Sequence, residues 1–315
     1  MEIKPYKAGD EADILELFKL AFKKEMSIEY WNWRFKNNPF SQDILIHLMW
    51  DKNKLVGQYA VSPVEMLVEG EKMKAALVMT LMTHPDYMGK GIFPMLGKSL
   101  HSDLQNKYNY KMLYAFPNNN SHSHYGFVKN LYWKDIAILP MLSLKLTNLR
   151  FKNSGNLSYS IIDSFSGLAE ILNTSEKLVK LNKTETYLNW RYLRNPSEDY
   201  KIITVQNGQG IAVYKILKSF HEENQIEIDI MELVYENEEI LLEILHSIVH
   251  NEKKLSVNAL NIWKSIFASD FLLFEKLGFK IGLPLNYLSH LSFGNSNIIS
   301  NYKNWEIGLG YSDVF

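Results

Sequence analysis

Two hydrophobic patterns alternate along the chain, and together they predict a mixed α/β protein. The stretch Ala75–Met82 is apolar almost throughout, which is typical of a buried strand. The apolar residues that follow recur every four positions, as on one face of a helix that reaches about Gln105: Ile92, Leu96, Leu100 and Leu104. The intervening stretch His84–Gly91 contains two glycines and predicts a tight turn from strand to helix.

The rest of the first half predicts a definite order of elements. The predicted strands are Glu2–Tyr6, Ile44–Trp50, Leu55–Leu67, Met112–Phe116 and one beginning at Trp133–Leu139. The predicted helices are one with the stripe Ile14, Leu17, Phe18 and Phe22, one from Ile28 to about Lys36 before Pro39, and a short one opening at Pro117–Ser121. The resulting order is β-α-α-β-β-β-α-β-α-β.

The predicted glycine turn has the chemistry of an anion site. The first N–H groups of a helix have no partner within the helix and carry a partial positive charge. Gly89 and Gly91 lack a Cβ, so the backbone can approach a bulky anion closely. The turn contains neither the Gly-Lys-Ser/Thr of a P-loop nor the Gly-x-Gly-x-x-Gly of a dinucleotide fingerprint. It predicts a phosphate cradle built from main-chain amides, with a purely structural turn as the alternative.

The loop Asp86-Tyr87-Met88-Gly89-Lys90-Gly91 resembles motif A of the GNAT superfamily of acyl-CoA-dependent N-acyltransferases. That motif reads Gln/Arg-x-x-Gly-x-Gly/Ala after a strand, and its amides hold the CoA pyrophosphate. Asp86 departs from the usual Gln/Arg, and Met88 stands where a basic residue is common, so Lys90 is expected to supply part of the charge. The element order is also that of a GNAT domain. The resemblance implies a mostly antiparallel sheet with one splayed parallel pair, flanked by helices.

A ten-residue segment of the first half recurs in the second half. Residues 30–39 (YWNWRFKNNP) and 187–196 (YLNWRYLRNP) share six of ten positions at an offset of 157 residues. The repeated Trp-Arg helix is interpreted as a packing element, with a substrate-lining helix as the alternative. Residues 274–279 (FEKLGF) resemble the end of motif B of a GNAT domain. We therefore predict two tandem GNAT-like domains, residues 1–147 with the acyl-CoA cradle and residues 157–315 as a degenerate domain that shapes the acceptor site.

The second half lacks a cradle at the matching place. The loop after its corresponding strand reads Tyr235-Glu236-Asn237-Glu238-Glu239, without glycine. Carboxylates at a helix start stabilise the helix but repel a pyrophosphate. The sequence therefore predicts one CoA site per chain, in the first half.

The resemblance implies cofactor-binding positions residue by residue. Leu81 and Thr83 match strand residues whose backbone groups bind the pantetheine arm and polarise the thioester carbonyl. Asn120 matches an asparagine of motif B that contacts the cofactor, although an Asn-rich stretch is also ordinary turn chemistry. The full expected set is Leu81, Met82, Thr83, Met88, Gly89, Lys90, Gly91, Ile92, Asn118, Asn120 and Ser121.

The proton-transfer residues are harder to assign. Many GNAT enzymes use a motif B tyrosine to protonate the leaving thiolate, but Phe127 occupies that position. Tyr125, two residues earlier, is the predicted catalytic substitute. His122 and His124 lie nearby, and their Ser-His-Ser-His surroundings are not a metal-ligand spacing, so no metal is expected. As general base, only location suggests three candidates: His47, Glu65 and His84.

Composition excludes some classes of protein. The 315-residue chain has no cysteine, so disulfides, thiolate nucleophiles and Cys-ligated metals are excluded. Its 34 Lys and Arg nearly balance its 35 Asp and Glu, which argues against a general grip on nucleic acid or anionic lipid. Neither an apolar run of membrane-spanning length nor a signal peptide is evident, so a cytoplasmic protein is predicted.

The combined prediction is an enzyme that moves an acetyl or similar acyl group from acyl-CoA to an amine, on a small molecule or peptide. Mycothiol synthase keeps its cradle in the second of two GNAT halves, opposite to this chain, and Eis-type acetyltransferases carry a further domain. One alternative is a catalytically weak CoA-binding or interaction module, since Asp86, Met88 and Phe127 are off-pattern. Another is an aminoacyl-tRNA-dependent Fem-like transferase, against which Gly89 and Gly91 argue.

Overall fold

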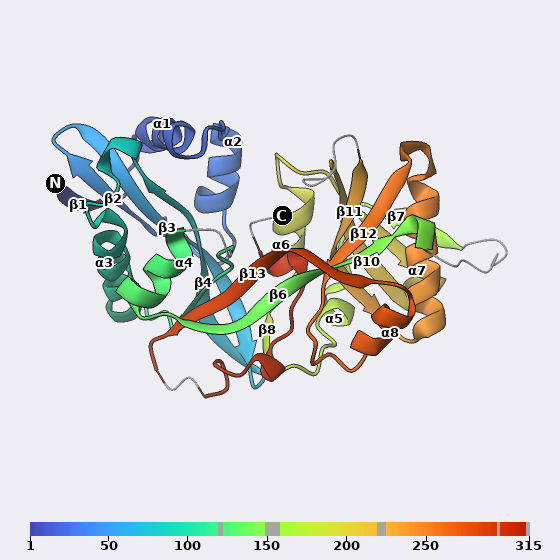
Figure 1. Ribbon diagram of the computed structural model, residues 1–315. Coiled ribbons are helices and arrows are strands. Elements are labelled where there is room, and N and C mark those ends of the chain that lie inside the picture. Colours follow the sequence, from blue (N-terminus) through green and yellow to red (C-terminus); the bar gives the residue numbers. More distant parts are fainter. Residues whose placement is uncertain (119–121, 149–157, 219–224, 295–296, 313–315) are drawn as a thin grey trace. The chain divides into compact units, whose positions relative to one another are not determined.

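A computed structural model describes residues 1–118, 122–148, 158–218, 225–294 and 297–312 (Figure 1). The chain divides into two compact units, and neither is a continuous half of the sequence. Unit 1 comprises Met1–Ile138, Leu178–Asn182 and Asn286–Trp305. Unit 2 comprises Leu139–Lys177, Lys183–Leu285 and Glu306–Phe315.

Unit 1 is built on a sheet with the strand order β1-β2-β3-β4-β5-β13, and β8 pairs with the far part of β3. Among the strand pairs of unit 1 in the described residues, β4 and β5 run parallel and the others are antiparallel. The strands are β1 (Glu2–Pro5), β2 (Ile46–Asp51), β3 (Lys54–Val68), β4 (Glu71–Thr83), β5 (Met112–Ala115), β8 (Val179–Leu181) and the second part of β13 (Lys280–Ser292).

Helices cover both faces of this sheet (Figure 1). On one face, α1 and α2 bury an apolar cluster that includes Trp31, Phe35 and Met79. On the other face, α3 buries the stripe predicted from the sequence, Ile92 to Leu104. The helices are α1 (Glu11–Phe22), α2 (Ile28–Trp31) with its π-helical continuation η1 (Asn32–Lys36), α3 (Ile92–Asn106), and α4 (His122–Tyr125) with its π-helical continuation η3 (Gly126–Asn130).

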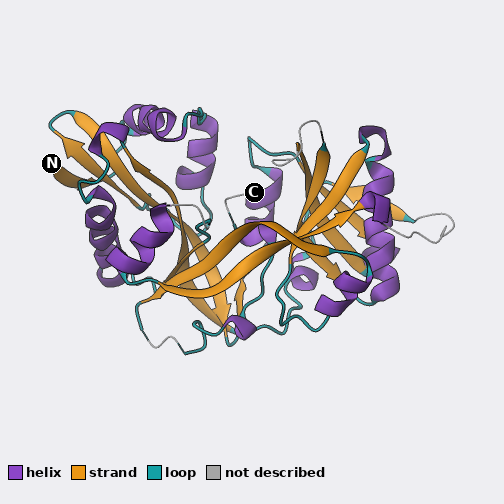
Figure 2. Cartoon of the chain, viewed as in Figure 1, coloured by secondary structure: helices purple, strands orange, loops and turns teal. Residues whose placement is uncertain are grey.

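Unit 2 repeats this plan with the strand order β6-β12-β11-β10-β9-β7. In the part of unit 2 that the structure describes, β11 and β12 run parallel and the other strand pairs are antiparallel. The strands are β6 (Lys134–Lys145), β7 (Tyr159–Ile162), β9 (Tyr200–Val205), β10 (Gly210–Lys218), β11 (Ile226–Tyr235) and β12 (Val257–Trp263). The helices are α5 (Ala169–Leu172), α6 (Glu185–Leu188) with the π-helical η5 (Asn189–Leu193), α7 (Glu238–Asn251) and α8 (Phe271–Lys276). Helix α7 packs along this sheet over an isoleucine- and leucine-rich core (Figure 2).

Each sheet contains a strand from the other half of the sequence at the edge of its parallel pair, and the unit 1 sheet also contains β8. In unit 1, Ser289–Ser292 of β13 pair with Met112–Ala115 of β5. In unit 2, Met141–Lys145 of β6 pair with Ala259–Trp263 of β12. The predicted strand at Trp133–Leu139 is present but continues to Lys145. The compact units therefore mix the two halves, and the division into repeats 1–147 and 157–315 stays a prediction.

The predicted fold class is confirmed, and the repeated segments adopt the same local structure. Ser27 and Thr184, 157 residues apart, each accept a hydrogen bond from a backbone N–H three residues later and cap α2 and α6. Both helices then widen into a π-helix over the Trp-Arg pair. Arg34 is buried and donates to Met79 Sδ at 2.9 Å, and buried Arg191 donates to the Tyr200 hydroxyl at 2.9 Å. These contacts agree with the packing interpretation.

Candidate active site

The glycine turn of unit 1 leaves room for a ligand at a helix N-terminus. Gly89 and Gly91 have φ of 76° and 72°, a left-handed conformation that favours glycine. An added Cβ at either position would meet no atom of the described residues within 4 Å, so both glycines face open space among these residues. Gly91 is the N-cap of α3, no side chain caps the helix there, and its first turn holds no carboxylate. The uncapped amides, the left-handed glycines and the open space form the main-chain cradle that the sequence predicts.

Strand β3 holds this helix end close to the sheet. A Cβ on Gly57 of β3 would collide with the Ile92 side chain in the first turn of α3. The missing side chain lets Ile92 and Leu96 pack into the core directly over the strand. The position of the cradle is therefore fixed by buried packing of α3, not by the exposed loop before it.

Charged and aromatic side chains surround the cradle. Lys90 Nζ lies 4.1 Å from the centre of the Tyr87 ring, a cation–π contact. The Tyr87 hydroxyl donates to Asp51 Oδ2 at 2.7 Å, and this hydrogen bond raises the pKa of Tyr87. Met88 is 67% exposed, and Asp86 is also exposed. Lys90 is thus held beside the cradle by Tyr87, where it can offset part of a phosphate charge.

A β-bulge interrupts β4 before the cradle. Two pairs, Gln58 with Met82 and Ala60 with Met79, show that β4 carries one residue more than β3 between them. Thr80 lies inside the bulge with φ of 51°, and its carbonyl accepts a hydrogen bond from Gln58 Nε2 at 3.0 Å. Gln58 is buried, and its Oε1 has no hydrogen-bond partner within the described part of the chain. A bulge re-aims backbone N–H and C=O groups, so this is where β4 can present them to a ligand.

The parallel strands separate next to this bulge. β4 and β5 pair only at Ala75–Leu77 with Met112–Tyr114 in the described residues. The predicted positions Leu81, Met82 and Thr83 lie beyond the last pair, on the same end of β4 as Gly89–Ile92. Asn118, beyond β5, forms an isolated bridge with Asn286. Asn120 and Ser121 lie outside the described residues. The predicted cofactor-binding positions on β4 and α3 are therefore brought together.

The predicted proton-transfer residues lie on α4 and η3. The Phe127 ring is buried against Phe93 in the first turn of α3 and against Trp133, with centroids 5.4 and 4.5 Å away. Tyr125 is 64% exposed. The His124 ring stacks on Tyr287 of β13, which restricts its orientation more than that of an ordinary surface histidine.

The three candidate bases are engaged in their own contacts. Glu65 accepts from Asn182 Nδ2 and pairs with Lys72. His47 is hydrogen-bonded to Ser99 and lies 3.3 Å from Asp103, and its burial lowers its pKa. His84 accepts the Asp86 N–H and so shapes the turn before the cradle. These contacts give each residue a structural role, and a catalytic role for any of them remains a prediction.

Unit 2 closes the corresponding helix end. The Asn237 side chain caps α7 by accepting the Ile240 N–H at 3.0 Å, and Glu238 and Glu239 occupy the first turn. The cap and the two carboxylates satisfy the amides and the helix dipole that α3 leaves available.

Comparison with known proteins identifies the family. Residues 2–131 match the acetyltransferase (GNAT) domain family. These residues belong to the GNAT superfamily. A GCN5-related N-acetyltransferase from Kribbella flavida is similar over 92% of this chain and 71% of that chain, with a TM-score of 0.67 and 12% identity. A conserved protein of unknown function from Enterococcus faecalis V583 is similar over 92% and 72%, with a TM-score of 0.70 and 15% identity.

A third similar structure is Saccharomyces cerevisiae N-myristoyltransferase with bound myristoyl-CoA, with a TM-score of 0.64 and 12% identity over 92% of this chain and 78% of that chain. No curated protein matches the sequence. The chain thus has the fold of an acyl-CoA-dependent N-acyltransferase. In the described residues, no cluster of side chains suited to a metal ion occurs, and no helix is long and apolar enough to cross a membrane.

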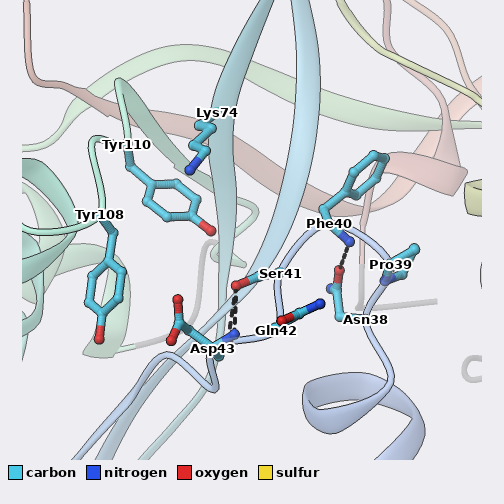
Figure 3. A pocket seen from close by; sticks show the side chains of 9 residues that line it. All are labelled: Asn38, Pro39, Phe40, Ser41, Gln42, Asp43, Lys74, Tyr108 and Tyr110. Atoms are coloured by element: carbon cyan, nitrogen blue, oxygen red, sulfur yellow. Dashed lines mark hydrogen bonds between the residues drawn. The ribbon is translucent and has the colours of Figure 1, made fainter.

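A polar hollow of about 330 Å³ lies elsewhere on the GNAT domain of unit 1 (Figure 3). The residues that line it are Asn38, Pro39, Phe40, Ser41, Gln42, Asp43, Lys74, Tyr108 and Tyr110. Lys74 is the fourth residue of β4 and lies nine residues before Thr83, so roughly 30 Å of extended strand separates the hollow from the cradle end. The hollow is therefore separate from the cradle.

Sequence analysis missed three residues that shape this GNAT site. Gln58 gave only a weak signal, a polar side chain inside an apolar strand. Gly57 gave no signal, because a glycine in a strand does not reveal which helix packs on it. Asp135, which contacts His124, lies eleven residues away from it and has no motif of its own.

Proposed function

We propose that unit 1 transfers an acetyl or similar acyl group from acyl-CoA to an amine, by direct attack of the amine on the thioester. One observation carries this proposal: the open glycine turn and the uncapped start of α3 lie at the end of β4 where, in the described residues, β4 no longer pairs with β5. A turn made only for geometry would not require uncapped amides beside open space.

In this proposal the CoA pyrophosphate binds the N–H groups of Gly89–Ile92 at the start of α3. Lys90, held on Tyr87, offsets part of its charge. The pantetheine arm runs along Leu81–Thr83. Asn118, beyond β5, would contact the arm from the other side of the separated strands. For Asn120 and Ser121, the resemblance alone implies a contact with the cofactor.

The chemistry requires little beyond positioning. A backbone N–H at Leu81 or Thr83 would polarise the thioester carbonyl and stabilise the negative charge that develops on it. The amine attacks the thioester directly, so the reaction needs no cysteine nucleophile, and the chain has none. The orphaned Gln58 Oε1 beside the bulge fits a ligand that donates a hydrogen bond, as the amides of pantetheine do.

The test is acyl transfer itself. Purified full-length protein is incubated with acetyl-CoA and a panel of amines (amino sugars, polyamines, aminoglycosides, peptides with free N-termini), and release of the CoA thiol is followed. Amine-dependent thiol release supports the proposal. Tight CoA binding by calorimetry without release for any amine would favour the second candidate, a CoA-binding module, which Phe127 at the usual tyrosine position favours. The role of residues 157–315 in acceptor binding remains a prediction.

A further inference from the structure

His124 of unit 1 is held by several contacts. Its ring lies flat on the Tyr287 ring, with centroids 3.7 Å apart and planes within 7°. Nε2 donates to Asp135 Oδ2 at 2.8 Å. The other carboxylate oxygen of Asp135 accepts from the buried Ser289 hydroxyl at 2.6 Å. The stack fixes the plane of the imidazole, and the carboxylate, itself held by Ser289, fixes its rotation.

This histidine and the bulge lie at matching distances along the strands from the last pair between β4 and β5. The last pair between the parallel strands joins Leu77 to Tyr114. Thr80 lies three residues beyond that pair on β4. On the other arm, the Tyr287 N–H donates to the carbonyl of Pro117, three residues beyond Tyr114. Three residues of strand span roughly 10 Å. The bulge on β4 and the His124–Tyr287 stack beyond β5 thus lie at about the same distance from the last pair between the two strands.

The same helix lacks the usual proton donor. Phe127 cannot give a proton, and its ring is buried against Phe93. His124 lies three residues earlier, in α4, which η3 continues. Histidine is the side chain that most often transfers protons in enzymes, and a carboxylate on one ring nitrogen commonly orients the other.

We propose that His124 gives the leaving CoA thiolate its proton and that Asp135 positions the imidazole. This rests on the proposed function. The amine lone pair bonds to the carbonyl carbon, and the carbon–sulfur bond breaks with its electron pair on sulfur. The proton on Nδ1 of the imidazolium moves to that sulfur, which leaves as the free thiol. The amine nitrogen releases its surplus proton to water, and solvent returns a proton to the imidazole. Tyr125 is the competing donor.

The experiment compares two acyl donors in the full-length protein. His124→Gln is expected to lower kcat with acetyl-CoA by about 10²- to 10⁴-fold, the range for a general acid. An aryl acetyl thioester has a weakly basic leaving thiolate that needs no proton, so with it the loss should be under about threefold. Asp135→Asn should also lower kcat more with acetyl-CoA than with the aryl thioester, but by a smaller factor than His124→Gln. His124→Phe keeps an aromatic ring stacked on Tyr287 but has no proton to donate. It replaces His124→Gln in the comparison if that variant does not fold.

The matched control is His250→Gln in unit 2. It removes another histidine whose ring contacts a tyrosine ring and is hydrogen-bonded, in this case to the Tyr159 hydroxyl. It should leave kcat unchanged with both donors. A folded His124 variant within twofold of wild-type kcat, or one that loses the same factor with both donors, would overturn the proposal. Failure of the proposed function looks different, because the wild-type protein itself would then release no thiol with any amine.

Discussion

Replacing Gly91 by asparagine is expected to abolish acyl-CoA binding while the protein stays folded. Asparagine tolerates the left-handed backbone better than other non-glycine residues, so it is a cleaner probe than valine at φ of 72°. Its side chain would enter the open space over the uncapped start of α3, because no atom in the described part of the chain lies within 4 Å of the added Cβ. The same space is where the pyrophosphate is proposed to bind.

The size of the effect follows from the amides that the side chain blocks. A hydrogen bond to a charged group contributes about 1.5–3 kcal/mol, so loss of two such bonds to pyrophosphate weakens binding by about 3–6 kcal/mol. That corresponds to roughly 10²- to 10⁴-fold in Kd. The backbone strain of a non-glycine residue here is about 1–2 kcal/mol at most, which lowers the melting temperature by only a few degrees.

The chain supplies a matched control in unit 2. Gly167 has φ of 74°, and an added Cβ there would also meet no described atom within 4 Å, so Gly167→Asn imposes the same strain away from the cradle. Calorimetric titration of CoA and thermal unfolding are measured for both variants. Equal small losses of melting temperature, with affinity lost only in Gly91→Asn, are expected. Wild-type affinity in a folded Gly91→Asn variant would refute the placement of the pyrophosphate.

Four further outcomes are expected. Tyr125→Phe should lower turnover by about 10- to 10⁴-fold if its hydroxyl is the proton donor; wild-type turnover would contradict that prediction. Titration of acetyl-CoA by calorimetry should give one site per chain, because the loop at residues 235–239 is capped and acidic; a stoichiometry of two would contradict it. Lys183→Met should cost about 3–5 kcal/mol in urea unfolding, because it strands the buried Glu232 carboxylate 2.8 Å from the lost ammonium; an unchanged midpoint would contradict this. Burial raises the pKa of Asp229 to about 6, so the folded state binds the proton more tightly than the unfolded state and stability falls as pH rises from about 4 to 6. Asp229→Asn should therefore stabilise the protein by about 1–3 kcal/mol at pH 7 and by little at pH 4, measured by thermal unfolding at both values.

Local patterns were sufficient to predict much of unit 1. The four-residue stripe from Ile92 to Leu104 predicted α3, and the apolar run Ala75–Met82 predicted the core of β4. The turn was predicted from Gly89 and Gly91, because left-handed conformations leave a direct mark on the sequence. These features depend on residues close together in the chain, so a single sequence carries them.

Features that depend on distant residues could not be predicted. Nothing within Ser289–Ser292 shows that these residues pair with β5, 174 positions away between Ser289 and Ala115. The bulge at Thr80 depends on the register against β3, which an apolar run does not determine. The His124–Asp135 contact likewise joins a helix to a strand through a side-chain geometry that no spacing rule gives.

Comparing the two units separates what the fold requires from what a ligand requires. Both have a capped α-to-π helix, a strand glycine under the first turn of the long helix (Gly57 and Gly210), and a one-residue bulge in the parallel strand before that helix. These shared features support the proposal of a tandem repeat and are explained by packing alone.

The differences lie where a ligand would act. Around the bulge of unit 1, Met26, Phe35 and Met82 belong to one apolar cluster. In unit 2, Lys183 and Tyr192 lie 157 residues after Met26 and Phe35, and Glu232 has the same place beside the bulge as Met82. These three residues form a buried polar network. Lys183 Nζ lies 2.8 Å from Glu232 Oε2, and the Tyr192 hydroxyl lies 2.6 Å from Glu232 Oε1. A network whose donors and acceptors bond one another has little capacity left for a substrate. Unit 1 keeps an uncapped helix start beside open space, so the ligand-binding chemistry is expected there.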